Sequence, residues 1–210
     1  MKRILFSLLF LSFGVFLYAQ NSSKPQNNFR PQWFIGAKGG ATISMVNFKP
    51  SVGQGFTFGA SYGPAFRYLS HKNVGLQFEL LYNERGWKEA ETNYNRKLSY
   101  LSLPFMTHIN FGGRIVRCFV NIGPEIGYLC KEKGIVKDSE IPQYQAAKNK
   151  FDYGIVGGLG LEIRTKIVAC MLEGRYYFGI GNIYGARTAD HFNTSSNQSI
   201  AINLAILFGM

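Results

Sequence analysis

Hydrophobic and polar side chains alternate along residues 55–70, which read GFTFGASYGPAFRYLS. Large apolar residues such as Phe56 and Phe58 occupy every second position, and small or polar residues such as Thr57 and Gly59 stand between them. Because successive side chains of a β-strand point to opposite faces, this pattern predicts a strand with one apolar face. That face has to contact either a protein core or lipid.

The same two-residue period recurs along the chain, so the sequence predicts an all-β protein. The eight predicted strands are residues 33–43, 55–70, 74–85, 98–110, 117–129, 151–164, 167–179 and 199–208. Pro64, Pro104 and Pro124 fall inside three of them. Since proline cannot donate a ladder hydrogen bond, we expect β-bulges at these positions.

The connections between the predicted strands alternate in length. The long ones are residues 46–54, 86–97, 131–150 and 181–198, and the short ones are 70–73, 111–115 and 165–166. Outer-membrane barrels have this arrangement, with short turns in the periplasm and long loops outside the cell. A soluble sandwich has no reason to sort its loops in this way. We therefore expect the N-terminus in the periplasm and the long loops outside.

Composition favours lipid as the partner of the apolar faces. Charged residues make up 17% of the chain, against about 25% in soluble domains. The opposite faces carry many glycine, alanine and serine residues, which suit the inside of a narrow barrel better than a face in water. A sheet in lipid must close, because hydrocarbon offers no hydrogen-bond partners. The sequence thus predicts an OmpA-like, eight-stranded antiparallel transmembrane β-barrel, with a soluble sandwich or lipocalin-like barrel as the alternative.

The first residues have the features of a targeting signal. Lys2 and Arg3 precede an apolar run over residues 4–17, and Ala19 is a small residue suited to cleavage. We expect a cleaved signal peptide at 1–19, a flexible polar leader at 20–31 and the outer-membrane barrel at 32–210. An uncleaved anchor is the alternative.

Strand parity divides the remaining notable residues into two groups. The predicted interior polar network has five basic and five acidic members, which most simply form a salt-bridged plug: Lys38, Arg67, Glu79, Arg85, Glu125, Asp152, Glu162, Arg164, Glu173 and Arg175. Aromatic residues near strand ends are predicted to form a girdle at the lipid–water boundary: Trp33, Tyr68, Tyr82, Trp87, Tyr128 and Tyr176.

Charge and cysteine content limit the partners. The formal net charge is +11, and for an exported protein anionic lipid is a better counterpart than nucleic acid. We expect contact with outer-membrane lipid and lipopolysaccharide and none with nucleic acid. Cys118, Cys130 and Cys170 are an odd set without metal-binding spacing, so we expect no disulfide framework, no metal and no cofactor.

The residue pattern does not favour an enzyme. Ser102 and His108 share a predicted inner face, but spacing fixes no third group to orient them. Asp190, His191 and Ser195 cluster in the last long connection, where polar residues are common. We expect no catalytic residues.

Five segments together resemble the PorT-family outer-membrane β-barrels of Bacteroidetes. They are VGLQFELLYNERGWKE (74–89), YLSLPFMTHINFG (100–112), FVNIGPEIGYL (119–129), FDYGIVGGLGLEI (151–163) and GRYYFGIGNI (174–183). Two features depart from the family: Ser102 stands where members often have Glu, and Gly209 and Met210 follow Phe208 at the end. The resemblance implies an eight-stranded barrel in the outer membrane of a Gram-negative bacterium. The family's namesake is linked to protein export by the type IX secretion system.

The functional expectation follows from the predicted plug and this resemblance. We expect a non-enzymatic barrel with a structural or interaction role at the cell envelope, linked to type IX secretion, whose long loops contact secretion proteins. A narrow solute pore or small-ligand-binding barrel is the main alternative, and an outer-leaflet lipid hydrolase is the third.

Overall fold

The computed structural model describes residues 29–49, 54–89, 95–135, 149–183 and 194–210. The predicted signal peptide and most of the predicted leader lie outside these residues, so the domain boundaries drawn from the sequence stay predictions. Within the described ranges, no helix has the length and apolar character needed to cross a membrane.

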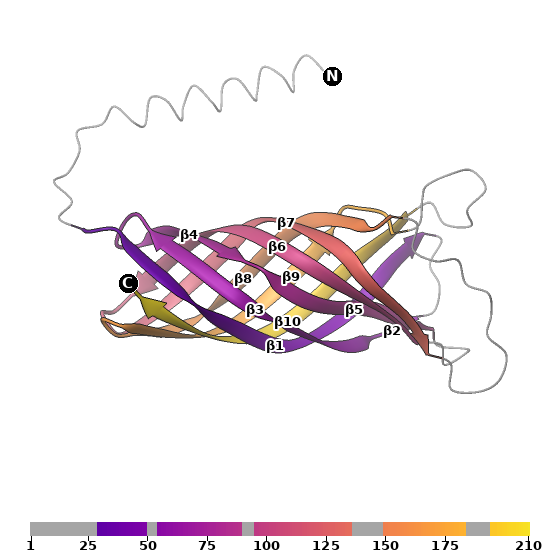
Figure 1. Cartoon of the computed structure of the whole chain (residues 1–210), viewed down its shortest axis with the longest axis horizontal. Coiled ribbons are helices and arrows are strands. Elements are labelled where there is room, and N and C mark those ends of the chain that lie inside the picture. The colour runs from indigo at the N-terminus through magenta and orange to yellow at the C-terminus, as the bar shows by residue number, and fades with distance from the viewer. Residues whose placement is uncertain (1–28, 50–53, 90–94, 136–148, 184–193) are drawn as a thin grey trace, which may run out of the picture. The chain divides into compact units, whose positions relative to one another are not determined.

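Ten β-strands in the described residues form a single antiparallel sheet that closes on itself (Figure 1). They are β1 (Gln32–Lys49), β2 (Gln54–Gly55), β3 (Thr57–Leu69), β4 (Val74–Glu79), β5 (Leu81–Glu89), β6 (Asn95–Gly112), β7 (Val116–Ile135), β8 (Phe151–Arg164), β9 (Val168–Gly179) and β10 (Thr194–Gly209). The pair β2 and β3 follows one path round the barrel, and so does the pair β4 and β5. Eight barrel strands result, and the fold predicted from the sequence is confirmed.

The first and last strands close the ring. β1 pairs with β10 from Phe34↔Gly209 to Lys49↔Thr194, and on its other side with β3 from Gln32↔Leu69 to Ser44↔Thr57. Each described barrel strand therefore has a partner on both sides. This removes the open sheet edge that hydrocarbon could not satisfy.

The strands run further than the sequence pattern indicated at the end opposite the short turns. β1 continues to Lys49, β5 to Glu89 and β7 to Ile135. The connections 50–53 and 90–94 are consequently short, so the prediction of four long loops is wrong for two of them. These extensions lie beyond the apolar belt of the barrel and are polar in composition. They therefore lack the apolar alternation from which the strands were predicted.

The three strand prolines do not produce the expected bulges. Leu80, opposite Pro64, separates β4 from β5, yet Tyr62↔Tyr82 and Ala65↔Glu79 keep one register on either side. Pro104 and Pro124 likewise border a gap in the β6–β7 ladder without a register shift, and the shift in that ladder lies between Ser99 and Tyr100. Each proline therefore lacks one ladder donor, but Leu80 still donates to the Pro64 carbonyl oxygen at 3.1 Å, and the strand path is unchanged.

The positions of apolar and polar side chains are the reverse of those in a soluble protein, with apolar side chains outside and charged ones inside. Large apolar side chains cover the outside of the barrel, among them Leu159 at 70% exposure and Ile202 at 65%. The inside holds the buried charges together with glycines. A Cβ atom on Gly123 would lie 2.0 Å from the Phe105 carbonyl oxygen, and one on Gly154 2.2 Å from that of Phe178. These glycines allow neighbouring strands to curve tightly.

Candidate functional site

The candidate site is the barrel interior, where the structure places all ten charged residues of the predicted polar network. Each is at most 7% exposed. They project from strands all round the ring, and ion pairs join them into three groups along the barrel. We call these the turn-end, middle and loop-end groups, according to their distance from the short turns.

The middle group joins four side chains from three strands. Lys38 on β1 contacts Glu79 on β4 at 2.9 Å and also pairs with Glu173 on β9. Arg175 on β9 lies 2.7 Å from Glu79 and 2.9 Å from Glu173. Asn121 donates to Glu173 at 2.6 Å. Two cations and two carboxylates face one another here, so the group is neutral.

The turn-end group has one carboxylate between two guanidinium groups. Glu162 on β8 pairs with both Arg67 and Arg164. The Arg67 Nε and Nη2 atoms donate to Gln77 Oε1 at 2.9 and 2.8 Å. Gln77 in turn donates to Glu79, which connects this group to the middle one. The group carries a formal charge of +1.

The loop-end group has the opposite balance. Arg85 on β5 pairs with Glu125 on β7 and lies 3.0 Å from Asp152 on β8. Its guanidinium also stacks 3.7 Å from the centre of the Tyr177 ring. Asn197 donates to Asp152 at 2.7 Å. With two carboxylates and one cation, this group carries a formal charge of −1.

The three groups together are electrically neutral and reach from one end of the barrel toward the other. Desolvating an ion costs several kcal/mol unless partners compensate it. Charges from opposite walls of the ring supply those partners, so the interior is stable only when the strands are in this register.

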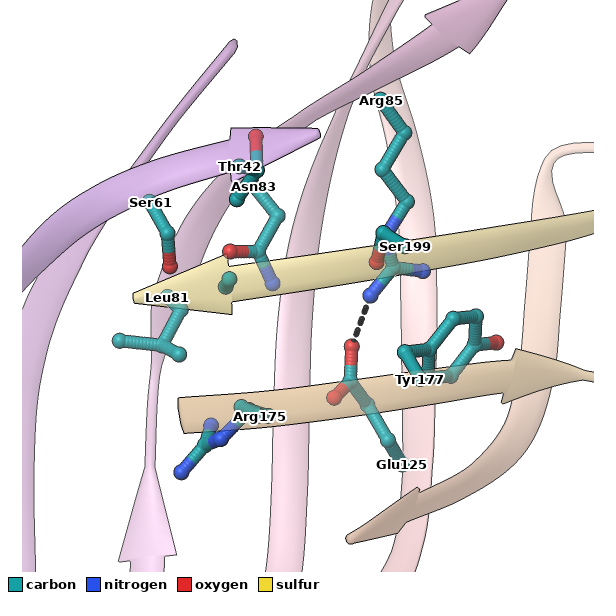
Figure 2. Close-up of a pocket in the computed structure, with 10 residues that line it drawn as sticks. Thr42, Ser61, Leu81, Asn83, Arg85, Glu125, Arg175, Tyr177 and Ser199 are labelled. Carbon is teal, nitrogen blue, oxygen red and sulfur yellow. Dashed lines mark hydrogen bonds and ion pairs between the residues drawn. The ribbon is translucent and has the colours of Figure 1, made fainter. Parts of the chain in front are cut away.

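A small cavity lies between the middle and loop-end groups (Figure 2). Polar side chains line it on one side, including Thr42, Ser61 and Asn83, and Arg85, Glu125 and Tyr177 line it on the other. Its volume is about 20 Å³, which leaves room for about one water molecule. It is too small for a substrate.

A buried apolar cluster continues the filling of the interior toward the loop end. Its members are Val46, Trp87, Leu98, Tyr100, Leu129 and Ile183. The prediction that Trp87 belongs to the lipid-facing girdle is therefore wrong. Trp87 is 7% exposed, and the Arg96 guanidinium lies 5.5 Å from its ring centre. Its even spacing from the inward-facing Arg85 could have identified it as an interior residue.

The other five predicted girdle aromatics lie on the outer surface. Trp33 and Tyr68, on the paired strands β1 and β3, have ring centres 4.2 Å apart. Tyr82 contacts Tyr62 across the β3–β5 pair at 5.4 Å. Tyr128 and Tyr176 are 42% and 45% exposed. Their contact with the membrane interface remains a prediction.

Ser102 and His108, the pair considered for catalysis, are not brought together. His108 and Ser102 are both buried on β6, but six residues separate them, or about 20 Å along a strand. His108 Nδ1 lies 2.7 Å from Asn121 Oδ1. Asp190 and His191 lie outside the described residues. Among the described residues no group of three or more potential metal ligands occurs.

Comparison with known proteins identifies the fold's family. Residues 18–185 match the family model described as "Outer membrane protein beta-barrel domain". The chain belongs to this family. It is a barrel of the outer membrane of Gram-negative bacteria, and the predicted location is confirmed. A search of curated proteins found no match.

Two solved outer-membrane barrels show the same fold. Neisserial surface protein A is 13% identical with a TM-score of 0.52, and the match covers 86% of this chain and 99% of that one. The outer-membrane protein OprG of Pseudomonas aeruginosa is 11% identical with a TM-score of 0.53, covering 85% and 96%. At such identities the similarity extends to the fold alone.

The buried ion pairs of the middle group predict that removing one of its carboxylates costs much more unfolding free energy than removing a half-exposed carboxylate. Glu79→Gln leaves Lys38 and Arg175 sharing one carboxylate, so we expect a loss of about 3 kcal/mol in unfolding free energy. The matched change is Glu84→Gln, whose half-exposed carboxylate lies 3.9 Å from Lys97 and should contribute about 0–1 kcal/mol. Urea unfolding in lipid vesicles, followed by tryptophan fluorescence, measures both. Equal midpoints for the two variants would contradict this assignment.

Proposed function

We propose that this protein is a non-enzymatic outer-membrane barrel with a closed interior and a structural or interaction role at the cell envelope. The main support for this proposal is the series of three ion-paired groups along the interior, which the apolar cluster around Trp87 continues. An eight-stranded barrel has an interior that side chains just fill. Here ion pairs join side chains from opposite walls of the barrel. A conducting path would have to break these ion pairs.

The size of the described cavity and the separation of Ser102 from His108 weigh against the two alternative functions. A pocket for a small organic ligand measures about 300–1,000 Å³, whereas the cavity beside Arg85 measures about 20 Å³. A lipid hydrolase needs a nucleophile and base within hydrogen-bonding reach. Ser102 and His108 are separated by six strand positions, which supports a non-enzymatic role.

The resemblance to PorT-family barrels of Bacteroidetes supports a more specific role in type IX secretion. In this proposal the outer surface contacts outer-membrane lipid and lipopolysaccharide, and the loop end contacts secretion-system proteins. The strand extensions support this division. β7 continues to Ile135 and exposes Lys131 and Lys133 beyond the apolar belt, where a partner could reach them.

The closed interior predicts that the protein does not conduct ions across a membrane. Folded protein reconstituted in a planar bilayer should show no steady conductance, because the ion-paired groups and the apolar cluster fill the interior among the described residues. An open porin inserted by the same procedure is the control for the recording. Resolved single-channel steps from the folded monomer would refute the closed interior and favour the solute pore.

The interaction role predicts contacts at the loop end. A photo-crosslinking amino acid at Lys133 should capture secretion-system proteins in native membranes, since this exposed side chain projects beyond the lipid-facing strands. The same probe at the outward-facing Leu159 is the control and should capture lipid. Recovery of an uncrosslinked barrel from both positions would oppose the interaction role.

A further inference from the structure

Each of the three short turns carries one exposed lysine or arginine. Lys72 lies in the β3–β4 turn, Arg114 in the β6–β7 turn and Lys166 in the β8–β9 turn. We call these three residues the basic rim. Arg117 lies next to it, half-buried, and donates to the Lys72 carbonyl oxygen at 3.2 Å and to Asn110 Oδ1 at 2.9 Å.

No exposed aspartate or glutamate side chain balances the basic rim among the described residues of that end. The acidic side chain described at that end is Glu162, which is fully buried between Arg67 and Arg164. The loop end differs, because Glu84 and Glu132 there face lysine and arginine partners. Among the described residues, half-exposed carboxylates thus accompany some of the cations at the loop end, whereas none accompanies the basic rim.

Backbone hydrogen bonds hold the three turns in fixed positions round the barrel. Asn110 donates to Asn73 at 2.8 Å, Arg164 to Ile115 at 2.8 Å, and Gly209 to Ile167 at 2.7 Å. Each turn is thus tied to the end of a neighbouring hairpin. In the closed strand order, these three turns alternate round that end, and the start of β1 and the end of β10 occupy the remaining position. The cations consequently encircle the barrel rather than gather on one side.

Large apolar side chains stand directly beside these cations. Ile115 follows Arg114 and is 61% exposed, and Ile167 follows Lys166 and is 67% exposed. Val74, two residues after Lys72, is 41% exposed. A cation next to an exposed apolar side chain suits the boundary between lipid headgroups and hydrocarbon. A soluble acidic protein would leave the isoleucines in water.

We infer that the basic rim binds the headgroups of anionic phospholipids in the periplasmic leaflet of the outer membrane. Short turns face the periplasm in outer-membrane barrels, and a surrounding leaflet can contact cations on all sides. The inference deepens the lipid contact of the proposed function. It is independent of the closed interior and of any secretion role, since a conducting barrel would keep the same rim.

Spin-labelled lipids test this inference on the full protein in vesicles. Phosphatidylglycerol and phosphatidylcholine labels report how strongly each lipid associates with the barrel surface. One Lys or Arg near an anionic surface is worth about fivefold in affinity, so we expect severalfold preference for phosphatidylglycerol at low salt. The preference for phosphatidylglycerol should fall at about 0.5 M salt, because the shorter Debye length screens the charges of the basic rim.

Two triple variants locate the effect. Lys72→Gln, Arg114→Gln and Lys166→Gln together should reduce the preference to near unity. The matched control removes three exposed lysines from the loop end, by Lys131→Gln, Lys133→Gln and Lys150→Gln, and should retain it. Both sets change solvent-exposed side chains, and the heat-dependent gel shift of a folded barrel verifies folding.

Two outcomes would overturn the inference. The first is equal association of the two lipids with the unmodified protein, and the second is an unchanged preference in the rim variant. If, in the second case, the rim variant also loses an acidic periplasmic protein that co-purifies with the unmodified barrel, the rim is assigned to a protein partner.

Discussion

The whole structure depends on closing the sheet. In hydrocarbon, each backbone N–H and C=O group must find its partner within the protein. β1 meets this constraint by pairing with both β3 and β10, and Met210 donates to the Trp33 carbonyl oxygen at 2.9 Å where the ring joins. Once the ring is closed, strand parity leaves only two environments, lipid outside and a narrow interior.

The closed ring in turn explains why the interior contains so many charges. Lys38, Glu79 and Arg175 come from three strands and meet because closure brings opposite walls within side-chain reach. The formal charge is +1 for the turn-end group, zero for the middle group and −1 for the loop-end group. Such a network stabilises one register strongly, since a slipped strand would leave buried charges without partners.

Sequence periodicity predicted the eight barrel strands and the inward direction of the charged residues, because both depend on parity alone. It could not predict the ion-pair partners: Arg67 and Glu162 are 95 residues apart and meet only through ring closure. Trp87 was misplaced because its residue type outweighed its parity with Arg85. The strand extension to Ile135 was missed because polar residues outside the belt carry no apolar alternation.

Collision of spin labels with oxygen and with a water-soluble nickel complex tests the central arrangement most directly. The labels replace Leu159 and Ile202 on the outer surface and Lys133 at the loop end, after Cys118, Cys130 and Cys170 are changed to Ser. In lipid bilayers we expect labels 159 and 202 to collide mainly with oxygen and label 133 mainly with nickel. If all three positions collide equally with nickel, the apolar surface does not face lipid and the account fails.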